Sequence, residues 1–268
     1  MILGGAHPDL QLLKREPNER GRETKNISTE QVERLRHDVG LAPFVGNRKV
    51  YAISNAEDLS IAAMNALLKT LEEPPPGVSL LLTSSEPALL LPTIKSRCQT
   101  LTLGPVEPDD IAGALVRRGA DAERAELLAH LAAGRAGWAF VALKDEEVIH
   151  QRDAELTNLV GLASASRVDR LAYAEALAAL NGKDPEQLRR RLGLWLGWWR
   201  DLALVRAGCE DLVVNVDKRA QLAEQSERFT LGQLRQFVAD IDLAVRRLSQ
   251  NVNARMALDV LLLAVPRP

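Results

Sequence analysis

A strand, a helix and a second strand follow one another within about forty residues, and this order constrains the fold more than any other feature. The runs KVYAI (Lys49 to Ile53) and SLLLTSS (from Ser79) are β-prone and bounded by turn residues. Between them apolar residues recur at helical spacing: Ile61, Met64, Leu67, Leu68 and Leu71. The prolines from Pro74 to Pro76 forbid continuation of that helix. Two strands joined through a helix are typical of a parallel sheet, so the pattern predicts an α/β module with buried parallel strands.

The flanking segments extend this module on both sides. Ser28 and Gln31 have the spacing of a capping box, which predicts a helix that begins after Ser28 and ends at Gly40. The stretch before it, through about Asn26, is polar and is predicted to be a surface segment rather than a core element. The run QTLTL, Gln99 to Leu103, is predicted to be a third strand.

Every periodic segment after this point predicts a helix. Short helices broken at Gly119 and Gly134 are expected up to about Ala142, and longer helices from about Glu147. Boundaries are therefore placed near Gly104 and Asp145. The fold class is α/β plus all-α, and mostly helical overall.

Composition describes an ordinary globular chain without a catalytic signature. Of 268 residues 46% are hydrophobic, and the net charge of −2 means that any contact with nucleic acid must come from a local face. Cys98 and Cys209 stand alone and the histidines lack ligand spacing, so no disulfide framework and no metal site is predicted. Neither a G-x-x-x-x-G-K-[ST] phosphate loop nor a G-x-S-x-G nucleophile elbow occurs. No apolar run is long enough to span a bilayer, so we expect a cytoplasmic protein.

Two groups of side chains call for a functional interpretation. Arg97 directly precedes a strand candidate and is expected near a sheet end, close to the surface. On spacing alone it is either a solvated or salt-bridged arginine, or an arginine projected into the nucleotide site of a neighbour. Three tryptophans on one helix face favour a core over a subunit interface: Trp195, Trp198 and Trp199.

Glu72 and Glu73 raise a question because they end the predicted helix. The C-terminal end of a helix carries partial negative charge and prefers cations, so an exposed acid there costs about 0.3–1 kcal/mol. Solvent can absorb that cost, or a partner outside the helix can offset it.

Five stretches occur in the order seen in subunits of the bacterial sliding-clamp loader, and the chain resembles this family over nearly its whole length. They are HPDL (His7 to Leu10), KVYAISNAEDL (Lys49 to Leu59), AMNALLKTLEEPP (Ala63 to Pro75), LLPTIKSRCQ (Leu90 to Gln99) and NVNARMALDVLLL (Asn251 to Leu263). LLKTLEEPP followed by SRC is highly specific, whereas HPDL or NVN alone would be weak. The strongest resemblance is to members of the DNA polymerase III machine that do not hydrolyse ATP.

The resemblance implies a three-part member of a hetero-oligomeric ring. Residues 1–104 would be a partial AAA+ α/β module whose P-loop part is missing, 105–146 a helical lid and 147–268 a helical collar for oligomerisation. The arginine of the family's S-R-C motif, here Arg97 within Ser96–Cys98, reaches the ATP of the adjacent ATPase subunit as an arginine finger in trans. No cofactor is therefore expected in this chain, and ATP and Mg²⁺ are expected in neighbouring subunits.

The same resemblance names partners and candidate contact residues. The expected partners are ATPase subunits of the gamma/tau type, the delta subunit, the sliding clamp and primed DNA that passes through the complex; no membrane is implied. Glu72 and Glu73 are interface candidates, because at least one of them is expected to face a basic group across a packed or subunit boundary. Lys69, on the same helix, is a candidate to face the DNA.

Departures from the family pattern carry information as well. Ser54 and Asn55 stand where active members have the acidic residues of Walker B, so that motif is degenerate, and Gly137 stands where ATPase subunits have a sensor arginine. Members also have a segment before HPDL with the first strand, a P-loop and zinc-binding cysteines, and Met1 stands almost at HPDL here. Either the start is internal or the truncation is real. In both cases we expect exposed apolar surface on the first module, and residues 1–104 alone to be unstable or sticky.

Three functions remain open. The first is a non-catalytic clamp-loader subunit that helps load the clamp during DNA replication and supplies Arg97 in trans. The second is an ATP-hydrolysing subunit of the gamma/tau type whose P-loop lies upstream. The third is a truncated adaptor that binds partners through its collar.

Overall fold

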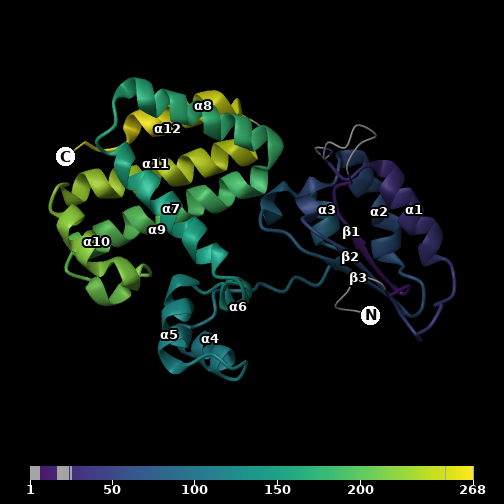
Figure 1. The fold of residues 1–268 in the computed structure, drawn as a ribbon. Helices are drawn as coiled ribbons and strands as arrows, with labels where there is room; N and C mark the ends of the chain where they lie inside the picture. The colour runs from purple at the N-terminus through teal and green to yellow at the C-terminus, as the bar shows by residue number, and fades with distance from the viewer. Residues whose placement is uncertain (1–6, 17–23, 25, 251, 268) are drawn as a thin grey trace. The chain divides into compact units, whose positions relative to one another are not determined.

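A computed structural model describes residues 7–16, 24, 26–250 and 252–267, and the chain divides into two units (Figure 1). These units are Met1–Leu103 and Gly104–Pro268. The division of the second unit into a lid and a collar stays a prediction.

The first unit is a three-stranded parallel sheet with helices between its strands. Its elements are β1 (Leu10–Leu13), α1 (Thr29–Val39), β2 (Lys49–Ile53), the 3₁₀ helix η2 (Ala56–Asp58), α2 (Ile61–Glu72), β3 (Val78–Leu82), η3 (Pro87–Leu89) and α3 (Pro92–Lys95). The strand order is β1-β2-β3, and both pairs are parallel. The predicted strand–helix–strand unit is therefore confirmed.

Local signals account for the bounds of α1 and α2. The Ser28 hydroxyl accepts from the backbone N–H of Gln31 and the Gln31 side chain accepts from the backbone N–H of Ser28, which is the predicted capping box, and Gly40 is the C-cap. Helix α2 begins after Ser60, whose side chain accepts from a backbone N–H, and ends before the proline run.

Two strand predictions were wrong. The first stretch, which was predicted to be a polar surface segment, contains β1. The sequence of this strand, LQLL, is too short to give a clear strand pattern, and in the structure its Gln11 and Leu12 are exposed. Residues 99–103 form no strand, and Leu101 and Leu103 are 81% and 85% exposed. A strand exists only through hydrogen bonds to a neighbour, and among the described residues this segment pairs with no strand.

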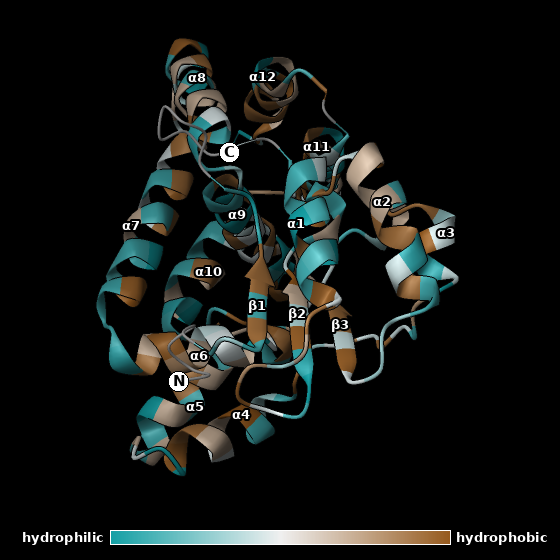
Figure 2. Ribbon diagram, turned by 90° about the vertical axis from the view of Figure 1, so that its right-hand side faces the viewer, coloured by the Kyte–Doolittle hydropathy of each residue, from teal (hydrophilic) through white to brown (hydrophobic). Residues whose placement is uncertain are grey.

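One face of the sheet is covered and the other is largely bare. Tyr51 and Ile53 of β2 are 1% and 0% exposed and belong to a core built with α1 and α2. On the opposite face the register aligns Leu12, Ala52 and Leu81, and the two leucines are 61% and 57% exposed. Figure 2 shows the hydrophobic colour of β1 and β3. The prediction that both β2 and β3 are buried was thus wrong for β3, which is half-buried apart from the exposed Leu81. The low stability expected for residues 1–104 stays a prediction.

The HPDL stretch fixes a loop beside the sheet. The carboxylate of Asp9 accepts the backbone N–H groups of Phe44, Val45 and Gly46 at 2.6, 2.8 and 2.7 Å. Hydrogen bonds from these donors lower the pKa of Asp9 to about 2 from its ordinary 3.8, and the largest contributions come from Phe44 and Gly46. Asp9 is 3% exposed, so these three bonds are the anchor of a loop whose Phe44 is 84% exposed.

Asp9→Asn is expected to destabilise the chain, because an amide presents N–H groups where three N–H donors need a charged acceptor. Folding lowers this pKa, so the contribution of Asp9 is full above its ordinary 3.8 and is lost as the pH falls from there through about 2. Calorimetric melting of the full chain at pH 7, 4 and 2.5 should show a gap between wild type and variant that narrows with acidity. A constant gap would contradict this, and Glu33→Gln, on the exposed surface of α1, is the control.

The second unit is entirely helical within its described residues. Its elements are α4 (Pro108–Val116), α5 (Ala122–Leu131), α6 (Ala136–Lys144), α7 (Glu147–Leu162), α8 (Arg167–Lys183), α9 (Pro185–Arg206), η4 (Glu210–Leu212), η5 (Val216–Lys218), α10 (Arg219–Ser226), α11 (Leu231–Ser249) and α12 (Ala254–Ala264). The breaks fall where glycine predicted them, at Gly119 and Gly134, both with positive φ. At Gly134 a Cβ atom would also lie 2.3 Å from that of Pro105. None of the described helices is both long and apolar enough to cross a membrane.

The tryptophans form the centre of the larger helical core. Trp195, Trp198 and Trp199 are 0%, 1% and 2% exposed, which confirms the core interpretation over an interface. The ring of Trp199 meets that of Phe237 edge-on with centroids 4.7 Å apart.

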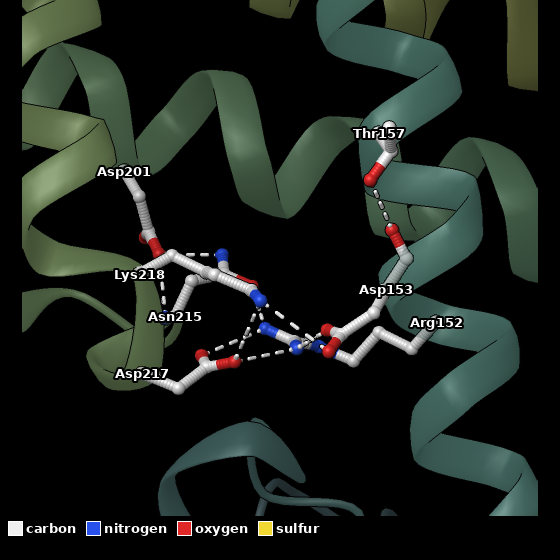
Figure 3. Close-up of polar contacts among 7 residues, drawn as sticks. All are labelled: Arg152, Asp153, Thr157, Asp201, Asn215, Asp217 and Lys218. Atoms are coloured by element: carbon white, nitrogen blue, oxygen red, sulfur yellow. Dashed lines mark hydrogen bonds and ion pairs between the residues drawn. The ribbon is translucent and has the colours of Figure 1, made fainter.

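A polar network ties this core to the loop after α9 (Figure 3). Arg152 of α7, with a side chain 6% exposed, donates to both carboxylate oxygens of Asp217 at 2.9 and 3.0 Å and to the Asn215 side chain. Asn215 in turn donates to Asp201 of α9, which also accepts the backbone N–H of Val214. Burial raises the pKa of Asp201, against the hydrogen bonds of Asn215. The network therefore joins α7, α9 and the η5 loop through Arg152.

Arg152→Ala should cost about 1–3 kcal/mol in the free energy of unfolding, because it leaves the buried side-chain oxygen of Asn215 without its donor and removes a cation from Asp217, whose side chain is 20% exposed. Urea unfolding measures this cost. Arg246→Ala, which removes an exposed pair with Asp242 on one helix, should cost less than about 0.5 kcal/mol. Equal costs would mean that the Arg152 network adds nothing beyond a surface pair.

Candidate functional site

The backbone around Arg97 is fixed by a short helix and the turn that closes it. Helix α3 begins at Pro92, and Ile94, 1% exposed, anchors it in the core of the first unit. The backbone N–H of Ser96 donates to the Pro92 carbonyl, and that of Arg97 donates to the Ile94 carbonyl at 3.1 Å. The turn is therefore set by hydrogen bonds, while the side chain of Arg97 leaves it toward the surface.

The guanidinium of Arg97 is held along one edge. Its Nε donates to Glu72 Oε2 at 3.0 Å, and Nη2 lies 3.0 Å from the same oxygen. Nη1 donates to the Thr93 carbonyl at 3.2 Å. A guanidinium has five N–H donors, so at least one N–H on each of Nη1 and Nη2 has no partner among the described residues. The side chain of Arg97 is 30% exposed, so part of it is open to solvent.

Glu72 therefore has a partner outside its helix. It is the last residue of α2, and Arg97 brings a positive charge to the end of that helix. The partner comes from the same chain, across the packed boundary between α2 and α3. Glu73, the C-cap, has no ion pair or side-chain hydrogen bond in the described part of the chain. A role of either acid in contact with another subunit stays a prediction.

Lys69 lies three residues before Glu72 and is exposed. Its side chain has no hydrogen bond or ion pair within the residues that the structure covers, so its charge is available to a partner. The structure thus brings Arg97 and Glu72 together, and it leaves Lys69 and Glu73 unpaired on the surface of the same helix.

Ser54 and Asn55 follow β2 at the carboxyl end of the parallel sheet, the usual ligand edge of such sheets. The backbone N–H of Ser54 donates to Leu13, and that of Asn55, which has a φ of 51°, donates to the hydroxyl of Thr83 at 3.2 Å. Both side chains are neutral. Within the described residues no group of three or more His, Cys, Asp or Glu side chains could hold a metal ion.

Sequence reasoning missed Glu57 at this edge. Its Oε1 accepts the backbone N–H and the hydroxyl of Ser85 at 3.0 and 2.8 Å, so it ties the loop after β3 to η2. Burial opposes ionisation, but hydrogen bonds from its own backbone and from Ser85 and Ser84 outweigh burial and lower the pKa of Glu57. No sequence signal separates Glu57 from a solvated acid, because its donors come from 28 residues away.

Both cysteines have free thiols. Cys98 is half-buried, whereas Cys209 is exposed. Burial raises the pKa of the Cys98 thiol, which favours the unreactive protonated form. Cys98 is therefore a small side chain packed against the core of the first unit rather than a reactive one.

A hollow of about 510 Å³ lies elsewhere, in the second unit. It is lined by Arg118, Gly119, Phe140, Leu143 and Lys144. The Arg118 guanidinium lies 3.6 Å from the centroid of the Phe140 ring. Arg118 and Lys144 stand at the C-terminal ends of α4 and α6, where the partial charge of the helix favours cations over a bound anion. These cations are explained without a ligand.

Two family descriptions match the chain. Residues 1–107 match "DNA polymerase III, delta subunit", and residues 146–266 match "DNA polymerase III, delta subunit, C terminal". The DNA polymerase III subunit delta' of Bacillus subtilis (strain 168) is 26% identical over 98% of this chain and 77% of that relative. The subunit delta' of Escherichia coli (strain K12) is 31% identical over 90% of this chain and 68% of that relative. The DNA polymerase III subunit tau of Bacillus subtilis (strain 168) is 30% identical over 76% of this chain and 40% of that relative.

Proposed function

Because the chain belongs to the delta prime family of DNA polymerase III subunits, we propose that it is a clamp-loader subunit that acts without hydrolysing ATP itself. It supplies Arg97 to ATP bound by a neighbouring subunit of the gamma/tau type, and so helps to load the sliding clamp onto primed DNA. The delta subunit and the clamp are its other partners, and ATP and Mg²⁺ bind in the neighbours.

The observation that carries this proposal is the outer edge of the Arg97 guanidinium. One N–H on each of Nη1 and Nη2 has no partner among the described residues, while the remainder of the group, on a side chain 30% exposed, is held by Glu72 and Thr93. Two parallel N–H donors match two phosphate oxygens, and a guanidinium so placed neutralises charge that develops on a transferring phosphoryl group.

The absence of a cis ATPase rests on the chemistry of the sheet edge. Hydrolysis needs a carboxylate after this strand to hold Mg²⁺ and orient water. Ser54 and Asn55 stand there, and neither carries charge.

The last helix supports assembly with other subunits. Met256, Val260 and Leu263 of α12 fall on one helical stripe and are 65%, 58% and 47% exposed. Exposed apolar stripes of this kind mark interaction sites, which fits a collar that packs against neighbours in a ring.

Arg97→Ala is expected to lower the DNA-stimulated ATP turnover of the reconstituted clamp loader. The single site next to this subunit should lose about 10²-fold or more, because its transition state loses a cation. The total ATP turnover of the complex should then fall at least to the part that the other ATPase sites contribute. Assembly, measured by size exclusion, should stay intact. Arg36→Ala, which removes an exposed arginine of α1 paired with Glu33, is the matched control and should leave turnover unchanged. Unchanged turnover in Arg97→Ala would reject the role in trans.

Lys69→Ala tests the proposed contact with primed DNA. If Lys69 contacts a phosphate, the slope of the logarithm of DNA affinity against the logarithm of salt concentration should become shallower by about 1. Fluorescence anisotropy of primed DNA with the assembled complex, titrated at several salt concentrations, measures this slope. An identical slope in wild type and variant would remove Lys69 from the DNA contact.

An ATP-hydrolysing subunit of the gamma/tau type is the second candidate, which the similarity to the tau subunit of Bacillus subtilis favours. A G-x-x-x-x-G-K-[ST] sequence in the genomic reading frame just before Met1, with Mg²⁺-dependent ATP hydrolysis by the resulting subunit, would select this candidate. Failure to co-purify with clamp-loader ATPase subunits would instead select an adaptor outside the loader.

A further inference from the structure

Glu72 and Arg97 meet although 25 residues separate them. Glu72 ends α2, and Arg97 lies in the turn after α3. Both backbones are anchored in one core, through Leu67 of α2 at 0% exposure and Ile94 of α3 at 1%. The contact therefore joins two fixed points rather than two mobile loops.

The edge of the guanidinium that Glu72 takes is the informative detail. One oxygen, Oε2, contacts Nε and Nη2, which form the inner edge. The Thr93 carbonyl accepts one N–H of Nη1 at 3.2 Å. Glu72 does not occupy the outer edge between Nη1 and Nη2, so its carboxylate can stay in place when an anion arrives there.

Charge favours the same arrangement. Glu72 adds a full negative charge to the C-terminal end of α2, where the helix already carries partial negative charge. The two together attract the guanidinium toward this end of the helix. The Glu72 side chain is 59% exposed, so water screens its charge from a ligand on the far side of the guanidinium.

We propose that Glu72 is the positioning residue of Arg97: it holds the inner edge of the guanidinium and thereby aims the outer edge at the phosphates of a neighbour's ATP. This inference rests on the proposed function of Arg97. A long arginine side chain has many rotamers, and a partner that fixes it in advance removes the cost of ordering it at the moment of reaction. The opposite role, in which Glu72 sequesters Arg97, requires the carboxylate to cover the outer edge, and it does not.

A double-mutant cycle in the reconstituted clamp loader tests the proposal. Glu72→Ala should lower the kcat for DNA-stimulated ATP turnover about three- to tenfold and change the KM for ATP less than about twofold, since ATP binds in the neighbour. In an Arg97→Ala background the same substitution should change kcat no further. Glu72→Gln keeps an oxygen acceptor for Nε, so it should lose only about twofold.

Controls separate positioning from stability and assembly. Glu33→Ala removes an exposed acid that pairs with Arg36 on α1, and it should leave kcat unchanged. Size exclusion and calorimetric melting verify that each variant folds and assembles. Glu72→Gln keeps the shape of the side chain and serves as the second variant where Glu72→Ala assembles poorly.

Each remaining outcome is decisive. A rise in kcat for Glu72→Ala would overturn positioning in favour of sequestration. If Glu72→Ala lowers kcat equally in the wild-type and the Arg97→Ala backgrounds, Glu72 acts at the subunit interface or in helix stability instead. A loss in Arg97→Ala without a loss in Glu72→Ala rejects this inference alone, whereas no loss in Arg97→Ala rejects the proposed function as well.

Discussion

The packing of α1 and α2 against one face of a parallel sheet is the constraint on which the first unit depends. Tyr51 and Ile53 are 1% and 0% exposed there, and they are buried together with residues of both helices. Because parallel strands must be joined by a crossover, this packing places the carboxyl end of β2 and the C-terminal end of α2 at fixed positions. Those two places carry Ser54 and Asn55, and Glu72 with its partner Arg97. The positions of the candidate site residues thus follow from the packing of the crossover helix α2 against the sheet.

The bare face of the same sheet has the opposite character. Leu12 and Leu81 stand beside Ala52 with more than half of each leucine exposed. Parallel sheets are normally covered on both faces, so apolar side chains in this register suit contact with further protein. In the second unit the Arg152 network closes the tryptophan core through Asp217 and Asn215, while Met256, Val260 and Leu263 of α12 stay exposed. Each unit therefore leaves some apolar side chains of its described residues exposed.

The Arg97 contact shows how one ion pair can combine two functions. Toward α2 it supplies the cation that a helix end with an acid requires. Away from α2 it presents donors that the chain itself does not use. An exposed pair of this kind adds little to stability, so its geometry matters more than its strength. This separation of inner and outer edges is what makes a positioning role for Glu72 physically reasonable.

Sequence by itself determined the elements whose signals are local. The capping box at Ser28, the end of α2 before Pro74, the strand Lys49–Ile53 and the buried tryptophan face all follow from neighbours in the chain, because caps, prolines and periodicity act within a few residues. Tertiary structure alone decided which strands exist and which charges meet. A strand forms only where a neighbouring strand pairs with it. For this reason β1 was not predicted, and the segment at residues 99–103 did not become a strand. Glu57 with Ser85, and Glu72 with Arg97, meet across 28 and 25 residues, and no local pattern encodes a contact that only packing creates.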